Sequence, residues 1–230
     1  MSRSNSEPDR NSGTSLTTGP IGGQLSAVVR GLLTRLQFTR MAERYDSLAV
    51  LSVFSFINGC LSIAIMAGLA LVTGQAFIFP SLGPTAFLFF YTPLAPAASP
   101  RNAIYGHLIG VAAGWGSLAV FGLRDVGPAL SEGVDGHRVA AAALSLGLTS
   151  GAMVLLRSPH PPAGATTLII SLGILRTPAQ MGVLMLAVGL LTLQAIVINR
   201  LAGLPYPLWS APPSGGPAQP QRPAPQLPGR

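Results

Sequence analysis

The sequence has no lysine, one cysteine and few acidic side chains. Its fourteen basic residues are all arginine and seven residues are acidic, which gives a formal net charge of +7. The single cysteine, Cys60, excludes an internal disulfide and a cysteine metal site, and its apolar setting predicts a packing role. No aromatic-interleaved basic patch accompanies the arginines, so no nucleic-acid partner is predicted. Paired carboxylates, a nucleophile beside a base and a metal-ligand cluster are all missing, so we expect neither an enzyme nor a cofactor or metal.

Charged residues are also missing from long stretches of the chain. The sequence is 49% hydrophobic and only 9% charged, with a mean hydropathy of +0.50, which is typical of a membrane protein that spans the bilayer several times. The uncharged stretches are residues 47–100, 102–123, 139–156, 158–175 and 177–199. A span needs about 20 residues, so they predict four full spans and two short, proline-broken helices near residues 80 and 163.

This pattern divides the chain into four regions. Residues 1–24 lack apolar periodicity and predict a disordered tail, and residues 25–45 predict a basic amphipathic helix on the membrane surface. A partner-binding helix is the alternative for residues 25–45. The membrane domain covers residues 46–202, with halves at about 46–123 and 138–202, and residues 203–230 form a Pro-rich tail that we expect to be disordered.

A polar motif interrupts the second half. Pro161 and Pro162 cannot continue a preceding helix but are tolerated in a first turn, so a new helix is predicted to start near Ala163. The first amides of such a helix have no intrahelical partner and lie at the positive end of its dipole, while Gly164 allows close approach to the backbone. This arrangement attracts anions.

A second copy of the motif occurs in the first half. Residues 80–85 and 161–166 share the pattern P-x-x-G-x-T, and each follows a long apolar segment. The chain therefore reads as an all-α membrane protein with a duplicated bundle of 3+3 segments, and the two broken helices are expected to meet as an inverted repeat around a binding site. The candidate binding residues are Ser81, Gly83, Thr85, His160, Gly164, Thr166 and Thr167, with Arg101, His107 and Arg157 as auxiliary residues.

Each candidate also has a purely structural interpretation. His160 could satisfy free carbonyls at the helix break, and the threonines could hydrogen-bond to their own helices. The arginines could anchor segment ends at the interface, and His107 could be buried against a neighbouring helix. The sequence leaves these alternatives open.

Small residues predict how the spans pack. Gly106, Gly110 and Gly114 recur every four residues, and Ala143, Gly147 and Gly151 do so in the next segment. Such faces let two helices approach closely. We expect both faces to be helix contacts.

The topology has two candidates. If the broken segments cross the membrane, the chain spans six times and the acidic loop around residues 124–138 lies outside. If they are re-entrant, that loop lies inside. The arginine distribution fits both, and we favour crossing because it makes the halves inverted; both termini are cytoplasmic in either case.

The run His160-Pro161-Pro162-Ala163-Gly164-Ala165-Thr166 resembles the signature of the HPP family of integral membrane proteins. Residues 100–102 (Pro-Arg-Asn) followed by Gly106-His107 resemble the first-half motif of that family. The resemblance implies a bacterial or organellar inner-membrane protein, with nitrite transport attributed to plastid and cyanobacterial members. The first broken segment, residues 81–86, departs from the Gly-Ala pattern of the family. Some members carry a nucleotide-sensing CBS pair after the membrane region; the Pro-rich tail is too short for one, so we expect no nucleotide regulation in cis.

Two function classes follow. The absence of Asp and Glu from residues 47–124 and 139–200 removes the usual carboxylate sites for cations, whereas threonines, helix N-termini and arginines suit a small monovalent anion such as nitrite. We therefore predict a transporter or channel for an inorganic anion in the bacterial inner membrane. The alternative is a non-transporting scaffold, and either protein could form a homo-oligomer in the bilayer.

Overall fold

The computed structural model describes residues 38–211, which contain helices and no strand. The predictions for residues 1–24, for 25–37 and for 212–230 lie outside the described part. Four long helices are present: α3 (Ser47–Thr73), α5 (Pro100–Val120), α7 (Gly136–Leu155) and α9 (Pro178–Leu201). Each is long and apolar enough to span a membrane, which confirms the predicted class and the four full spans.

The remaining helices are short. Two of them are the predicted proline-broken helices, α4 (Leu82–Tyr91) and α8 (Ala163–Ser171). The others are α2 (Phe38–Arg44), the 3₁₀ turn η1 (Pro96–Ala98) and α6 (Ala129–Glu132). The helix predicted to start near Ala163 begins at that residue, because Pro161 and Pro162 form the turn before it.

Local sequence explains where the long helices begin. Asp46 accepts hydrogen bonds from the amides of Leu48 and Ala49 and so caps α3. Ser99 caps α5 ahead of a proline at the first position, and Thr177 caps α9 in a capping box with Gln180. These caps satisfy amides that a helix terminus leaves without partners.

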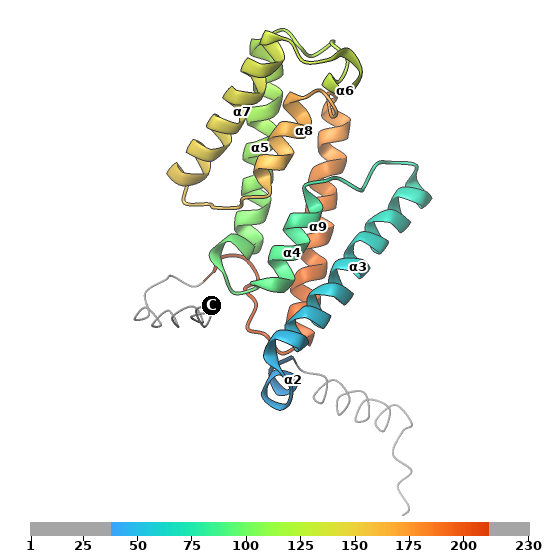
Figure 1. The fold of residues 1–230 in the computed structure, drawn as a ribbon, viewed down its shortest axis with the longest axis vertical. Helices are drawn as coiled ribbons and strands as arrows, with labels where there is room; N and C mark the ends of the chain where they lie inside the picture. The colour runs from blue at the N-terminus through green and yellow to red at the C-terminus, as the bar shows by residue number, and fades with distance from the viewer. Residues whose placement is uncertain (1–37, 212–230) are drawn as a thin grey trace, which may run out of the picture.

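The helices lie lengthwise in one bundle that has two ends (Figure 1). We call these the α2 end and the α6 end. At the α2 end, the Phe38 amide bonds the Ala202 carbonyl at 3.0 Å, and the Tyr206 hydroxyl bonds the Ala98 carbonyl at 2.6 Å. At the α6 end, the Ala129 amide bonds the Leu172 carbonyl at 2.9 Å. Gln75 and Ala76, which follow α3, line a cavity together with Leu175 and Gln180 near the start of α9, and α4 runs from this region towards the α2 end (Figure 1). The crossing topology itself stays a prediction.

The two halves run in opposite directions. Helices α3 and α5 leave the α2 end, whereas α7 and α9 leave the α6 end (Figure 1). The short helices α4 and α8 begin near each other in the middle of the bundle and run towards opposite ends. This is the arrangement expected of inverted halves; the duplication itself stays a prediction.

Helix α5 packs closely on α8 through its glycine face. A Cβ atom on Gly110 would lie 2.7 Å from the Ala163 carbonyl oxygen, and one on Gly114 would lie 2.9 Å from the Thr167 carbonyl oxygen. Only glycine allows the two backbones to approach so closely. The predicted close packing of this face is confirmed.

The second small-residue face does not pack within the chain. Ala143, Gly147 and Gly151 are all exposed on α7, and a Cβ on either glycine would meet no atom within 4 Å. The expected helix contact is therefore wrong for the single chain. Cys60 is likewise exposed on α3, so its predicted packing role is wrong as well.

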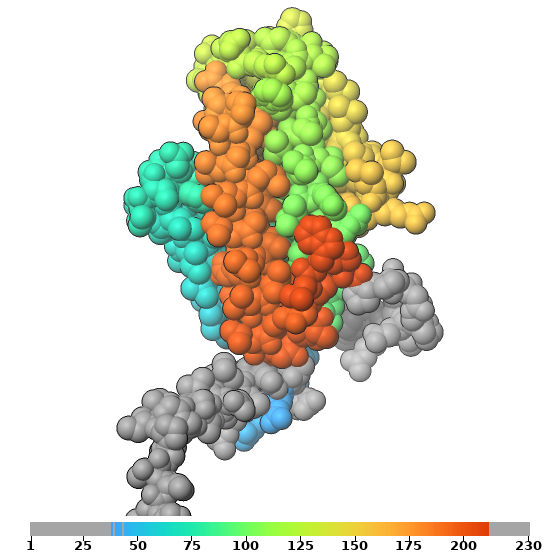
Figure 2. Space-filling model, turned by 180° about the vertical axis from the view of Figure 1, so that it is seen from behind, coloured from blue at the N-terminus to red at the C-terminus, as the bar shows by residue number. Residues whose placement is uncertain are grey.

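Residues 203–211 fold back over the bundle and lie across α9 and α5 (Figure 2). Tyr206 in this segment is completely buried. The Arg101 amide donates to the Trp209 carbonyl at 2.9 Å, and the ring of Trp209 meets Tyr105 edge-on. The predicted tail boundary at residue 203 is therefore too early, because an aromatic residue and backbone bonds hold this part of the Pro-rich segment.

One arginine is buried at the α6 end. The side chain of Arg138 is 2% exposed and donates to the carbonyls of Ser171 at 3.2 Å and Gly127 at 2.7 Å. Ser171 is the last residue of α8, so a positive charge lies at the negative end of that helix dipole. Arg138 thereby joins α7, α8 and the loop that precedes α6.

Candidate functional site

Four buried polar side chains meet where α4 and α8 begin. His107 of α5 lies between the two threonines that the repeat predicts, with Nε2 at 2.9 Å from Thr85 Oγ1 and Nδ1 at 2.7 Å from Thr166 Oγ1. His160 completes the group, with Nε2 at 3.2 Å from His107 Nε2 and 3.3 Å from Thr85 Oγ1. All four side chains have no exposed surface. We call them the His–Thr cluster.

Three different segments place the cluster inside the bundle. Thr85 and Thr166 lie in the first turns of α4 and α8, and His160 precedes α8 in the proline turn. His107 comes seven residues after Pro100, so at 1.5 Å per residue it lies about 10 Å along α5 from the α2 end. A Cβ on Gly106 would lie 2.6 Å from His160 Cβ, so that glycine makes room for the imidazole.

The η1 turn holds the cluster from the α2 end. Its carbonyls at Pro96, Ala97 and Ala98 each accept a side-chain hydrogen bond. The donors are Asn102 Nδ2 at 2.9 Å, His160 Nδ1 at 2.8 Å and Tyr206 Oη at 2.6 Å, respectively. The sequence analysis did not identify Tyr206, because this residue lies in the Pro-rich segment after residue 203, whose composition predicts disorder.

Two predicted hydroxyl residues are buried without partners. Ser81 and Thr167 have no exposed surface, and the hydroxyl oxygen of each lacks a hydrogen-bond partner within the described part of the chain. Ser81 precedes α4 and Thr167 follows Thr166, so both belong to the turns that carry the cluster. A buried hydroxyl without a partner is unfavourable by about 1–3 kcal/mol, and a bound water or ion would satisfy it.

The predicted glycines lie elsewhere. Gly83 is exposed, and a Cβ there would meet no atom within 4 Å. A Cβ on Gly164 would lie 3.4 Å from Leu146 Cδ1, so this glycine faces α7. The structure therefore does not bring either glycine to the His–Thr cluster.

The amides at the start of α8 are also not free. The amides of Ala163, Gly164 and Ala165 donate to the carbonyls of the three residues from His160 to Pro162, at 3.0 to 3.1 Å. The proline turn thus supplies the partners that an isolated helix would lack. The expectation of free amides is wrong in this conformation, and the polar groups of the site are side chains.

The auxiliary arginines lie at the α2 end, away from the cluster. Arg101 Nη1 donates to the Arg157 carbonyl at 3.4 Å, and its guanidinium lies 5.2 Å from the Tyr105 ring centroid. Arg157 is exposed and adopts a left-handed backbone conformation with φ of 50°. These contacts match the interpretation that the arginines anchor segment ends.

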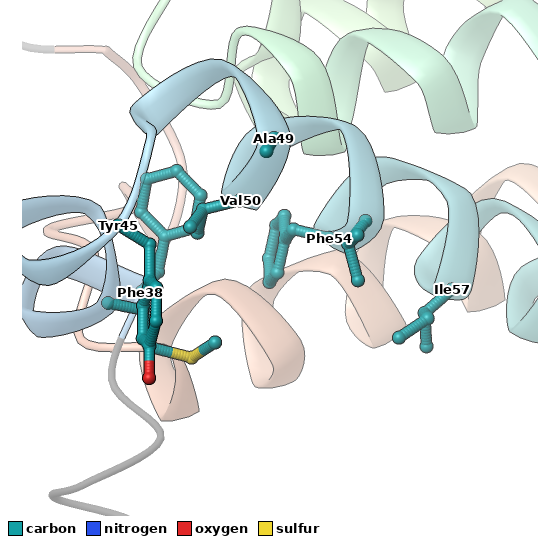
Figure 3. Close-up of a pocket in the computed structure, with 8 residues that line it drawn as sticks. Phe38, Tyr45, Ala49, Val50, Phe54 and Ile57 are labelled. Atoms are coloured by element: carbon teal, nitrogen blue, oxygen red, sulfur yellow. The ribbon is translucent and has the colours of Figure 1, made fainter.

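Two surface cavities differ in chemistry. A groove of about 510 Å³ between α2 and α3 is lined by apolar side chains, including Phe38, Val50 and Phe54 (Figure 3). A cavity of about 490 Å³ at the α6 end is lined by Arg124, Arg176 and the acidic Asp125, together with polar and apolar residues. Only the second offers charged donors, and Arg124 there stacks on Trp115 at 4.0 Å.

The fold and the site define a multi-pass α-helical membrane protein with a buried, carboxylate-free polar centre. The family model described as "HPP, transmembrane region" matches residues 46–207, and the chain belongs to that family. A transmembrane protein of Dictyostelium discoideum is 34% identical over 93 residues, which cover 40% of this chain and 27% of that protein. The match thus spans about a quarter of that relative. No solved structure matches the chain.

Proposed function

We propose that this protein carries a small monovalent anion across the membrane, with nitrite as a candidate substrate. The observation that carries the proposal is the His–Thr cluster, where hydroxyl and imidazole groups from both halves meet inside the bundle. Paired short helices that meet at a buried polar centre are typical binding sites of transporters.

The chemistry of the cluster suits an anion. Hydroxyls and imidazole N–H groups are hydrogen-bond donors, and Ser81 and Thr167 add two hydroxyls that lack partners. The helices α3, α4, α5, α7, α8 and α9 contain no Asp or Glu, so no carboxylate competes with an anionic ligand or binds a cation. Among the described residues, no group of three metal-ligating side chains occurs, and the proposal includes neither catalysis nor a metal.

The cluster is closed in this conformation. Its side chains bond one another and have no exposed surface, so an anion must replace some of these bonds to bind. Because Thr85 and His107 come from one half and His160 and Thr166 from the other, a small separation of the halves would open the cluster. This conformation therefore fits an occluded state between two open ones.

The arginine distribution supports an orientation. Arg40, Arg44, Arg101, Arg157 and Arg200 lie at the α2 end, whereas Arg124, Arg138 and Arg176 lie at the α6 end beside the acidic loop. Under the positive-inside rule this distribution supports a cytoplasmic α2 end, in line with the expected cytoplasmic termini. A bacterial inner membrane is the proposed location.

Uptake into proteoliposomes tests the proposal. Nitrite, nitrate, formate, bicarbonate and chloride are compared with protein-free vesicles, and at least one anion should enter faster with the protein. Thr166→Val should weaken binding by roughly 0.5–1.5 kcal/mol, or up to about tenfold, because it removes a hydroxyl from the cluster. Thr149→Val is the matched control, since Thr149 is equally buried and donates only to Ser145 of its own helix at 2.8 Å.

Thr167 gives a sharper test. Replacing an unpartnered buried hydroxyl by the isosteric Val should leave the fold equally or more stable. If that hydroxyl contacts the anion, Thr167→Val uptake falls while thermal stability does not. Unchanged uptake by both Thr166→Val and Thr167→Val would contradict a binding role for the cluster.

A non-transporting scaffold is the second candidate. The exposed small-residue face of α7, formed by Ala143, Gly147 and Gly151, favours it, because such faces pair helices in membranes. Thermal unfolding with and without anions distinguishes the transporter from the scaffold. An anion that binds the transporter should raise its unfolding temperature, whereas a scaffold has no site whose occupation would stabilise it.

A further inference from the structure

The hydrogen bonds of the His–Thr cluster fix where its protons lie when both imidazoles are neutral. A carbonyl only accepts, so His160 Nδ1 carries the proton that it donates to Ala97, and His160 Nε2 is bare. The Thr85 hydroxyl donates to the Ser81 carbonyl at 2.9 Å, so Thr85 Oγ1 accepts from His107 Nε2, also at 2.9 Å. His107 Nε2 therefore carries a proton, and it faces the bare His160 Nε2 at 3.2 Å. His107 Nδ1 is then bare and accepts from the Thr166 hydroxyl at 2.7 Å.

This arrangement accepts one more proton and no second one. The first extra proton binds His107 Nδ1, and the Thr166 hydroxyl, which can rotate, then accepts from the ring instead of donating to it. A second would protonate His160 Nε2 and force two N–H groups of two positive rings against each other across 3.2 Å. The pair of histidines is thus a carrier for a single proton.

Proton uptake also frees a donor for an anion. In the neutral cluster the Thr166 hydroxyl proton is used by His107, whereas in the protonated cluster that proton can point to a ligand. The charge of the ring has no carboxylate to balance it within the surrounding helices, because α4, α5, α7, α8 and α9 contain none. Burying a positive charge or an anion alone is strongly unfavourable in free energy, whereas burying the two as a pair is much less unfavourable.

Other charged or titratable groups around the cluster lie at the ends of the elements that pack against it. Arg101 begins α5 and Arg157 follows α7, and both face the α2 end. Tyr206 is buried beside Phe89 and bonds Ala98. Arg138 bonds the last carbonyl of α8 at the other end. None of them bonds the two histidines.

Resting on the proposed anion transport, we propose that His107 and His160 take up one proton with each anion, so that transport is an electroneutral symport of anion and proton. The proton and the anion bind together and leave together. The substrate class is therefore an anion moved as the equivalent of its acid.

Purified protein in vesicles with an internal pH dye tests this inference, with nitrite and nitrate as probes. Nitrate is the cleaner probe, because its acid form is negligible and does not leak through lipid. The expected result is internal acidification of about one proton per anion, with accumulation unaffected by a potassium–valinomycin potential. Accumulation of a lone monovalent anion would change about fifty-fold per 100 mV. Anion uptake that follows the potential without acidification overturns the symport and leaves anion transport standing, whereas no uptake of nitrite, nitrate or any of the other three anions named above ends both.

Histidine variants assign the proton to the pair. His107→Gln should abolish acidification coupled to anion entry, and His160→Gln should reduce it, because a glutamine can bond both neighbours but cannot be charged. His137 is exposed at the start of α7, and His137→Gln should leave the ratio of protons to anions unchanged. A thermal unfolding curve for each variant separates loss of coupling from loss of fold. Folded His107→Gln and His160→Gln proteins that still move one proton per anion would contradict the assignment.

Discussion

Replacing Gly110 by alanine should move α8 away from α5 and disturb the His–Thr cluster. The added Cβ would lie 2.7 Å from the Ala163 carbonyl oxygen, whereas an ordinary contact is at least 3.4 Å. The contact atom belongs to the backbone and cannot rotate away, so α8 must shift by about 0.7 Å. Thr166 moves with it and loses much of its 2.7 Å hydrogen bond to His107.

Gly116→Ala in the same helix is the matched control. A Cβ there meets no atom within 4 Å, so the substitution only gains the helix propensity of alanine, about 1 kcal/mol. Both variants share that gain, and their difference isolates overpacking, which costs about 1–3 kcal/mol. We expect Gly110→Ala to be less stable than Gly116→Ala by this amount.

Thermal unfolding of both proteins in the same detergent measures the difference, and anion uptake measures the effect on the site. Gly110→Ala should lose stability and uptake together, while Gly116→Ala should keep both. Equal unfolding midpoints for the two variants would refute the close backbone contact between α5 and α8. If the two variants differ in stability but take up the anion equally well, the contact between α5 and α8 does not affect the His–Thr cluster.

Three further predictions concern other parts of the chain. Gly164→Leu should lower the unfolding midpoint because it crowds α7, whereas Gly83→Leu on an exposed surface should not; equal midpoints would contradict these placements. Burial raises the pKa of Tyr206 above its usual value, so folded protein should lose stability as pH rises above about 10, and Tyr206→Phe should lack this loss in unfolding curves between pH 8 and 11. Ser131→Cys, in a Cys60→Ser background, should react with an impermeant thiol reagent in intact cells; labelling only after lysis would place the α6 end inside.

The element pattern could be read from the sequence because charge and proline mark it directly. Missing charges delimited the four spans, and Pro161 and Pro162 fixed the start of α8 at Ala163. The P-x-x-G-x-T pattern also selected Thr85 and Thr166, which the structure brings to the same histidine. These features are local, and local rules suffice for them.

Side-chain direction could not be read in the same way. Gly83 and Gly164 share the motif with the threonines, yet a helix turns about 100° per residue, so neighbours two positions apart face different partners. His107 ranked only as auxiliary, because its central place depends on contacts between segments more than fifty residues apart along the chain. No local sequence pattern indicated that Tyr206 is buried, because its burial depends on packing against the distant η1 turn.

Through the η1 turn, residues 205–211 help to hold the imidazole of His160 in place without contacting it. Tyr206 donates to the Ala98 carbonyl and His160 donates to the adjacent Ala97 carbonyl, so both side chains are bonded to the same short turn. A chain cut after Leu204 would keep every helix from α2 to α9 and still loosen the ring of His160. A partner that binds residues 205–211 at the α2 end would then alter the position of His160 in the His–Thr cluster, which lies about 10 Å further into the bundle.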